Sequence, residues 1–191
     1  VSGLIQIGAY EEALSAIRQE TETHQKLIDF ISRTFNSKVI AGLLLGKYSR
    51  AKELGLALHF DPYCHLSGTP TKLTDDELAA IIGNLLDNAY EATLKNPDSN
   101  KCISILISDA NETELVVEVA DNGTGIPDEI EKSLFDKGIT SKSQSGHGIG
   151  LYLVHQLVNN AGGAILVDDA EPTGTIFSLF IPNESLKDAN L

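Results

Sequence analysis

The chain has no methionine and no tryptophan, only two cysteines, and 14 basic residues against 27 acidic ones. Its net charge of -13 repels nucleic-acid phosphates, so we expect no nucleic-acid binding. Cys64 and Cys102 lack the spacing of metal ligands, and nothing resembles a secretory signal, which favours a reducing, cytosolic setting. No uninterrupted run of about 18 apolar residues occurs, so we expect no membrane segment in this chain.

Residue 1 is valine, whereas a translated protein normally begins with methionine. We therefore expect this chain to be a piece of a longer protein. Its length suits a compact domain of about 130 to 150 residues with a smaller helical part. We place the helical part at residues 1–55, the main domain at 56–182 and a polar tail at 183–191.

Apolar residues spaced by threes and fours predict a long helix with a single seam over residues 10–35, after a helical stub at 4–7 that Gly8 ends. A second helix is expected over residues 37–54, with Gly55 as its stop signal. Its predicted apolar face consists of Val39, Leu43, Leu44, Tyr48 and Ala51.

The main domain mixes strands and helices. Thr74 and Glu77 have the spacing of a capping box, which opens a predicted helix over residues 74–95. A polar, glycine-rich stretch at residues 135–147 is interpreted as a lid. The other predicted elements are strands at 57–61, 103–107, 115–119, 164–168 and 175–181, and helices at 127–134 and 149–161.

Asparagine recurs on one face of the helix predicted at residues 74–95. Asn84, Asn88 and Glu91 are four and three residues apart and therefore share that face. Magnesium prefers oxygen ligands and keeps several waters, so the Asn88 carbonyl is our candidate metal ligand. On this helix alone, a polar face in contact with water remains the alternative.

Asp121 ends a predicted strand and is followed by Gly123 and Gly125. Its carboxylate can accept a hydrogen bond from an adenine amino group, and the glycines let the backbone pass close to a base. An ordinary Asp-Asn-Gly turn is the alternative.

Three glycines at alternate positions, Gly146, Gly148 and Gly150, run directly into a predicted helix. Backbone amides at a helix start can bind a phosphate, and the spacing excludes the dinucleotide-binding and P-loop motifs. A glycine-rich helix start without a ligand is the alternative. Lys137 and Lys142 can neutralise phosphate charge, although lysines in polar loops are usually solvated.

These stretches resemble, in order, conserved boxes of the superfamily of histidine kinases, DNA gyrase B subunits and related ATPases. The resemblance covers about residues 58–182, and its N, G1, F and G2 boxes and Gly-Thr element lie at 84–88, 121–125, 135–138, 146–150 and 174–175. The complete set, including the F box, is specific to sensor histidine kinases. Residues 38–47, 84–92 and 135–142 resemble the citrate and C4-dicarboxylate sensor kinases.

The resemblance implies an α+β fold: a two-layer α/β sandwich of the Bergerat type, with a mixed sheet and helices on one face, after a truncated helical dimerisation domain. It also implies ATP and Mg²⁺ as cofactors, with Asp121 at the adenine, Asn88 at magnesium, Asn84 beside the phosphates and Thr175 supporting the base through water. Further nucleotide-binding residues would be Gly123, Gly125, Ile126, Lys137, Lys142, Gly146, His147, Gly148, Ile149, Gly150 and Leu151.

Asn84 stands where the ATPases of the superfamily carry a glutamate that activates water. Asparagine has no basic site for that proton, so we predict phosphoryl transfer to another nucleophile, with Asn84 and Asn88 as the catalytic residues. One departure is Glu91, which stands where many kinases have a lysine or arginine.

The chain does not contain a convincing acceptor histidine. His24 is the only histidine in the long helix, but it lies at a seam position and lacks the family's asparagine four residues later. We therefore place the acceptor upstream of Val1 and do not expect this fragment to phosphorylate itself. His147 lies in the predicted lid, where it either contacts phosphate or faces solvent.

The resemblance further implies a homodimer in the full-length protein, a response regulator as partner, and the cytoplasmic portion of an inner-membrane sensor. Two alternatives remain open: an ATP hydrolase of the same fold, and a non-enzymatic nucleotide-sensing dimerisation module.

Overall fold

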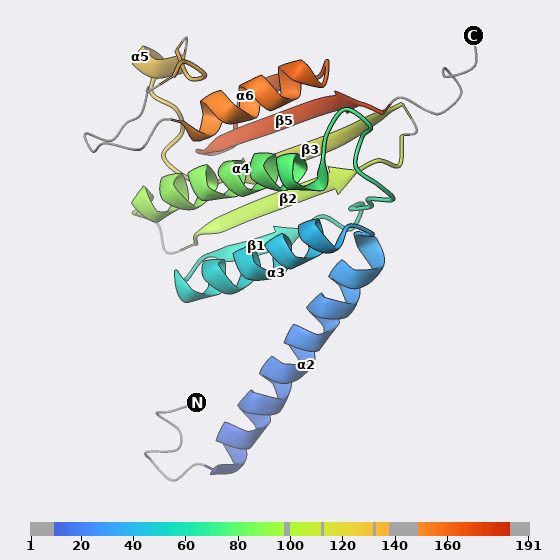
Figure 1. Cartoon of the computed structure of the whole chain (residues 1–191). Helices are drawn as coiled ribbons and strands as arrows, with labels where there is room; N and C mark the ends of the chain where they lie inside the picture. The colour runs from blue at the N-terminus through green and yellow to red at the C-terminus, as the bar shows by residue number, and fades with distance from the viewer. Residues whose placement is uncertain (1–9, 98–99, 112, 132, 138–148, 184–191) are drawn as a thin grey trace.

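The computed structural model describes residues 10–97, 100–111, 113–131, 133–137 and 149–183. Within them a mixed five-stranded sheet is covered on one face by helices, while the N-terminal helix projects away (Figure 1). In chain order the elements are α2 (Tyr10–Thr34), α3 (Lys38–Glu53), β1 (Ala57–Phe60), α4 (Asp75–Lys95), β2 (Cys102–Ser108), β3 (Glu114–Asp121), α5 (Asp128–Glu131), α6 (Gly150–Asn160), β4 (Ala164–Asp169) and β5 (Thr175–Pro182).

The strand order is β1-β2-β3-β5-β4, with β1 parallel to β2 and the other neighbours antiparallel. Side chains alternate between the faces of a strand, and every second residue of β3 from Leu115 to Asp121 is buried. The matching row of β5, from Thr175 to Ile181, is buried as well. Helix α4 packs on β2 and β3, α3 on β1 and α6 on β4, so the predicted α+β fold with helices on one face of a mixed sheet is confirmed.

Helix α4 is the central helix of the covering layer and lies between α3 and α6 (Figure 1). The capping box is present: the Thr74 hydroxyl accepts from the Glu77 N–H, and the Glu77 carboxylate accepts from the Thr74 N–H. Burial of each large apolar side chain contributes about 1.5 to 3 kcal/mol. The fully buried apolar residues of α4 are Leu78, Ile81, Ile82, Leu85 and Leu86.

The predicted buried face of α3 is partly wrong. Val39 is 42% exposed, whereas its neighbour Ile40 is fully buried together with Leu44 and Ala51. The Ser37 hydroxyl caps the helix by accepting from the Ile40 N–H. Ile40, Leu44 and Ala51 are four and seven residues apart, so they form one stripe, and Val39 lies about 100° away from Ile40 around the helix.

Helix α3 is part of the layer over the sheet. Lys47 forms a 2.5 Å ion pair with Asp87 of α4, and the Tyr90 hydroxyl donates to the Lys47 carbonyl at 2.8 Å. The domain boundary after residue 55 stays a prediction, and this packing favours a boundary between α2 and α3.

Helix α2 follows the predicted range closely and meets the rest of the protein at its C-terminal end. Ile31 and Phe35 are buried there, whereas His24 is exposed. No helix in the described part of the chain is long and apolar enough to cross a membrane. The predicted stub at 4–7, most of the predicted lid and the tail at 184–191 lie outside the described residues. The short helix predicted at 127–134 is limited to α5.

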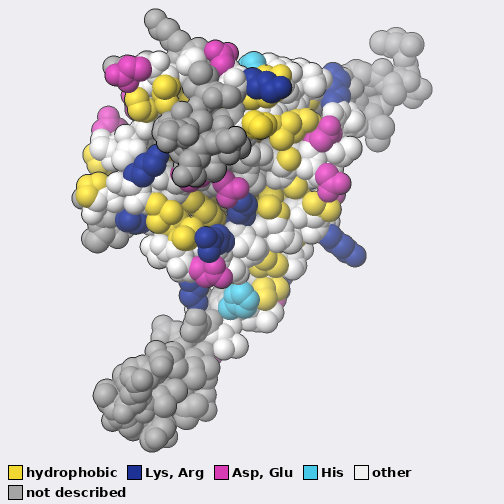
Figure 2. All heavy atoms as spheres, turned by 60° about the vertical axis from the view of Figure 1, so that its left-hand side comes forward, with side chains coloured by type: hydrophobic (Ala, Val, Ile, Leu, Met, Phe, Trp, Pro, Cys, Tyr) yellow, Lys and Arg dark blue, Asp and Glu magenta, His cyan; other side chains and the backbone are white. Residues whose placement is uncertain are grey.

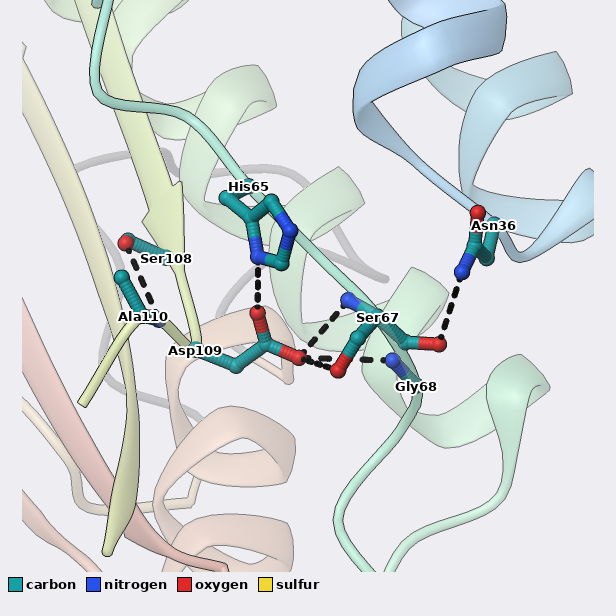
Figure 3. Close-up of polar contacts among 7 residues, drawn as sticks. All are labelled: Asn36, His65, Ser67, Gly68, Ser108, Asp109 and Ala110. Atoms are coloured by element: carbon teal, nitrogen blue, oxygen red, sulfur yellow. Dashed lines mark hydrogen bonds and ion pairs between the residues drawn. The ribbon is translucent and has the colours of Figure 1, made fainter. Parts of the chain in front are cut away.

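The loop between β1 and α4 is anchored by Asp109, directly after β2 (Figure 3). The Asp109 side chain is 1% exposed. It accepts from His65 Nδ1 at 2.7 Å, from the Ser67 N–H at 2.7 Å and from the Gly68 N–H at 3.3 Å, and the Ser67 hydroxyl also donates to it. Burial raises the pKa of this carboxyl, but the bonds from Ser67, His65 and Gly68 together hold the pKa below its ordinary value.

The same loop binds the end of α2. The Leu66 N–H donates to the Thr34 carbonyl at 2.9 Å, and the Asn36 N–H donates to the Leu66 carbonyl at 3.0 Å. The Asn36 side chain donates to the Ser67 carbonyl at 3.1 Å (Figure 3). Backbone pairing therefore connects α2 to the sheet through a loop that Asp109 holds.

Candidate functional site

Asn84 of α4 and Gly150, the first residue of α6, lie next to each other. Asn84 Nδ2 donates to the Ala80 carbonyl at 2.7 Å, which fixes the amide. A Cβ atom added to Gly150 would lie 2.5 Å from Asn84 Oδ1. The start of α6 therefore accommodates the Asn84 amide only because residue 150 has no side chain.

Asn88 lies one turn further along α4. Its Nδ2 atom is buried and has no hydrogen-bond partner among the described residues. An orphaned buried amide costs about 1 to 3 kcal/mol unless a ligand satisfies it. Rotation of the amide by about 180° exchanges its oxygen and nitrogen, and an amide oxygen is a ligand that magnesium accepts. The Asn88 side chain is therefore suited to its predicted role as a magnesium ligand.

Asp121 is the last residue of β3 and is 5% exposed. It pairs with Thr175, the first residue of β5, and both side chains are buried. Asp121 Oδ1 accepts from the Gly123 N–H at 2.8 Å. Gly174 has φ +125°, and a Cβ atom there would lie 1.9 Å from the Asp121 backbone oxygen. Only glycine fits beside this strand end.

Burial raises the pKa of Asp121 to about 6, although the backbone N–H groups of Gly123 and Thr175 lower it. A carboxylate that is largely withdrawn from water and still has acceptor capacity is suited to bind a ligand N–H group. The geometry therefore fits the predicted contact with an adenine amino group.

A single stripe of α4 connects these two groups of residues. A Cβ atom added to Gly123 would lie 2.5 Å from the backbone carbon of Ala92, so the turn after Asp121 rests on α4 at Ala92. Asn84, Asn88 and Ala92 are spaced by four residues and share one face of the helix. Asn84 and Ala92, at the two ends of this stripe, lie about 12 Å apart along the helix axis. This stripe therefore connects the turn after Asp121 at one end with the start of α6 at the other.

The remaining predicted residues fall into three groups. Ile126 and Leu151 are partly buried against the core, and Gly125 has φ +71°. Ile149 is 52% exposed, and Lys137 lies 6.0 Å from the centre of the Tyr152 ring. The predicted positions that lie outside the described residues are Lys142, Gly146, His147 and Gly148.

Figure 2 shows the side of the molecule that lies on the left in Figure 1. Hydrophobic side chains form several patches there, with basic and acidic side chains between them (Figure 2). In the described ranges, no group of three or more His, Cys, Asp or Glu residues can hold a metal ion. A metal site built on Asn88 would thus depend on oxygens of a ligand and water.

Sequence reasoning missed two contacts near this site. Phe135 and His155 stack with ring centres 5.0 Å apart, although neither was expected to contact the other. The Asn96 side chain donates to the Asn122 carbonyl, whereas the sequence predicts only a helix that ends at residue 95 and a turn that contains Asn122. The position of Asn122 beside Asp121 was the available clue.

Comparison with known proteins gives a consistent result. Residues 74–185 match the family model described as "Histidine kinase-, DNA gyrase B-, and HSP90-like ATPase". The sensor histidine kinase CitA of Klebsiella pneumoniae is 48% identical over 182 residues, covering 95% of this chain and 33% of the relative. A probable C4-dicarboxylate sensor kinase of Bacillus subtilis is 35% identical over 182 residues, which cover 95% of this chain and 34% of the relative. The chain thus spans about a third of the length of these curated relatives.

Solved structures resemble the fold. The catalytic domain of the histidine kinase ThkA has a TM-score of 0.62 and 25% identity, covering 76% of this chain and 91% of that chain. Full-length ShkA in complex with AMPPNP has a TM-score of 0.58 and 24% identity, covering 75% of this chain and 29% of that chain.

Proposed function

Because the chain belongs to the family of histidine kinase-, DNA gyrase B- and HSP90-like ATPases, we propose that it is the ATP-binding catalytic part of a two-component sensor histidine kinase. It donates the γ-phosphate of ATP to a histidine located upstream of this sequence. The observation that carries the proposal is the stripe of α4, on which Asn84, Asn88 and Ala92 connect the start of α6 with the turn after Asp121.

Each end of the stripe has a separate task. Asp121 accepts a hydrogen bond from the adenine amino group, and its burial makes that bond selective. Asn84 and the N-terminus of α6 lie at the phosphate end, where backbone N–H groups favour a negative ligand. Asn88 lies between them and supplies an oxygen to magnesium, which neutralises charge on the phosphates.

Asn84 argues for transfer rather than hydrolysis. Its Nδ2 is used by the Ala80 carbonyl, and an amide oxygen is too weak a base to remove a proton from water. The residue therefore positions the phosphates and leaves activation of the nucleophile to the acceptor.

The curated relatives support the wider setting. Their names describe sensor kinases, one of them for C4-dicarboxylates. We extend this to the present chain as a homodimer in the full-length protein, the cytoplasmic part of an inner-membrane sensor, with a response regulator as partner.

A transfer experiment tests the proposal. The chain is mixed with magnesium, γ-labelled ATP and a full-length partner whose own nucleotide site is disabled but whose acceptor histidine is intact. We expect label on the partner. Gly150→Ala should abolish labelling because the added methyl group displaces Asn84 Oδ1, whereas Gly46→Ala, which has open space around it, should not.

The same samples distinguish the rival functions. Steady phosphate release by the chain alone, without label on the partner, would replace the kinase by an ATP hydrolase. ATP binding with neither reaction would replace it by a nucleotide-sensing module. Absence of ATP binding would refute the pocket itself.

A further inference from the structure

Two asparagines that the proposed reaction does not use lie at the Asp121 end of the site. Asn122 directly follows Asp121, and Asn96 is the C-cap of α4. Asn96 Nδ2 donates to the Asn122 carbonyl. We call this pair, with the bonds it makes, the amide clasp.

Asn122 is bonded through its backbone and through both ends of its side-chain amide. Its side-chain Oδ1 accepts from the Cys102 N–H at 2.8 Å, and its Nδ2 donates to the Asn100 carbonyl at 2.5 Å. Its own N–H donates to the Cys102 carbonyl at 3.2 Å. Asn122 thus holds the turn against the start of β2, and Asn96 holds the same turn against the end of α4.

The clasp fixes a segment that has little rigidity of its own. Gly123 and Gly125 follow Asn122, and glycine permits many backbone conformations. The Asp121 carboxylate accepts a hydrogen bond from the Gly123 N–H, which belongs to this segment. The position of the carboxylate therefore depends on how firmly residue 122 is held.

The clasp also fixes the position of the Asp121 turn relative to α4. Asn84 and Asn88 are part of α4, and Asn96 ends that helix. By bonding Asn122, Asn96 ties the Asp121 turn to the element that carries the phosphate end of the site. Both side-chain polar atoms of Asn122 face backbone groups, so the residue acts through Asp121 rather than on a ligand.

We propose that Asn122 and Asn96 are positioning residues that hold Asp121 in place for the amino group of adenine, and so determine the selectivity of the site for a 6-aminopurine. The inference rests on the proposed function. A purely structural role for the clasp would instead weaken the binding of every nucleotide equally.

The test compares ATP with inosine triphosphate, whose base carries a carbonyl oxygen in place of the amino group. Dissociation constants of both magnesium complexes are measured by calorimetry for the intact chain and for Asn122→Ala. We expect the intact chain to prefer ATP, and Asn122→Ala to lower that preference by about tenfold, the loss of one well-oriented hydrogen bond. The affinity for inosine triphosphate should change by less than about twofold.

Two further variants sharpen the result. Asn122→Asp keeps an oxygen for the Cys102 N–H but sets a carboxylate oxygen against the Asn100 carbonyl, so it should lower the preference as Asn122→Ala does. Asn111→Ala, at the turn between β2 and β3, should leave the preference unchanged. If Asn122→Ala does not fold, Asn96→Ala removes the donor to the Asn122 carbonyl and should lower the preference in the same direction.

The outcomes separate the two proposals. An unchanged preference in the clasp variants, or an equal loss for both nucleotides, overturns the clasp and leaves the proposed function intact. Failure of the intact chain to bind either nucleotide, or binding of both with equal affinity, overturns the proposed ATP site.

Discussion

Replacement of Asp121 by asparagine should change stability and binding in opposite directions. Burial raises the pKa of the Asp121 carboxyl from 3.8 to about 6. The folded state therefore holds the proton more tightly than the unfolded chain does. The stability that this proton contributes is fully present below the unfolded pKa and is lost as the pH rises through the folded value.

The size of the effect follows from the two pKa values. At pH 8, ionisation at this position lowers the free energy of unfolding by at most about 3 kcal/mol, and at pH 5 by roughly half of that. The asparagine of the variant would have no charge at either pH. The difference in unfolding free energy between Asp121→Asn and the intact chain should therefore increase by about 1 to 2 kcal/mol in favour of the variant from pH 5 to pH 8.

Urea unfolding of both proteins at pH 5, 6, 7 and 8, without nucleotide, measures this difference. Any fixed effect of the new amide hydrogens cancels, because only the change with pH is compared. ATP binding at pH 8 should weaken in the variant, because an amide oxygen that keeps the bond from the Gly123 N–H leaves the amide nitrogen, a donor, facing the adenine amino group. A difference independent of pH would refute the raised pKa, and an unchanged ATP affinity would refute the placement of Asp121 at the base.

Two more predictions concern the ends of the sheet. Gly174→Ala should destabilise the fold by about 3 kcal/mol or more, because the residue has φ +125° and the added carbon would overlap the Asp121 backbone. The control Gly46→Ala, in the exposed part of α3, should instead stabilise the fold by about 0.5 to 1 kcal/mol. Thermal melts of the two variants measure these changes. Asp109→Asn should cost about 1 to 3 kcal/mol near neutral pH. The pKa of Asp109 is held below its ordinary value of 3.8, so the stability that its carboxylate contributes is present above pH 3.8 and is lost as the pH falls through the lower folded pKa. The loss caused by Asp109→Asn should therefore be smaller at pH 2 than at pH 7 in urea unfolding, and an equal loss at both would contradict the assignment.

Much of the fold could be predicted because it depends on local patterns. The capping box at Thr74 fixes the start of α4, and strict alternation identifies β2 and β3. The orientation of α3 does not follow from the sequence, because both Val39 and Ile40 are apolar and only the packing partner decides which of them is buried. Packing of α3 against α4 involves residues 40 positions apart, which no local pattern reveals.

The site could be predicted only where its chemistry is carried by adjacent residues. Asn84 and Gly150 were both identified, yet their contact joins residues far apart in the sequence and follows from the packing of α6 on α4. Their roles toward ATP stay predictions. The Asp109 anchor and the amide clasp were missed because each consists of common residue types whose partners come from other loops.

The two ends of the sheet differ in how their buried polar groups are satisfied. At the end of β2, Asp109 receives hydrogen bonds from three residues and its pKa falls. At the end of β3, Asp121 has a raised pKa, and nearby Asn88 has an amide nitrogen without a described partner. Both features lower stability, and both are relieved by a ligand that donates a hydrogen bond to the Asp121 carboxylate and gives the Asn88 amide a partner. The first arrangement serves stability. The second is what the proposed binding site requires, because groups that cost free energy in the empty protein repay it only when a ligand is bound.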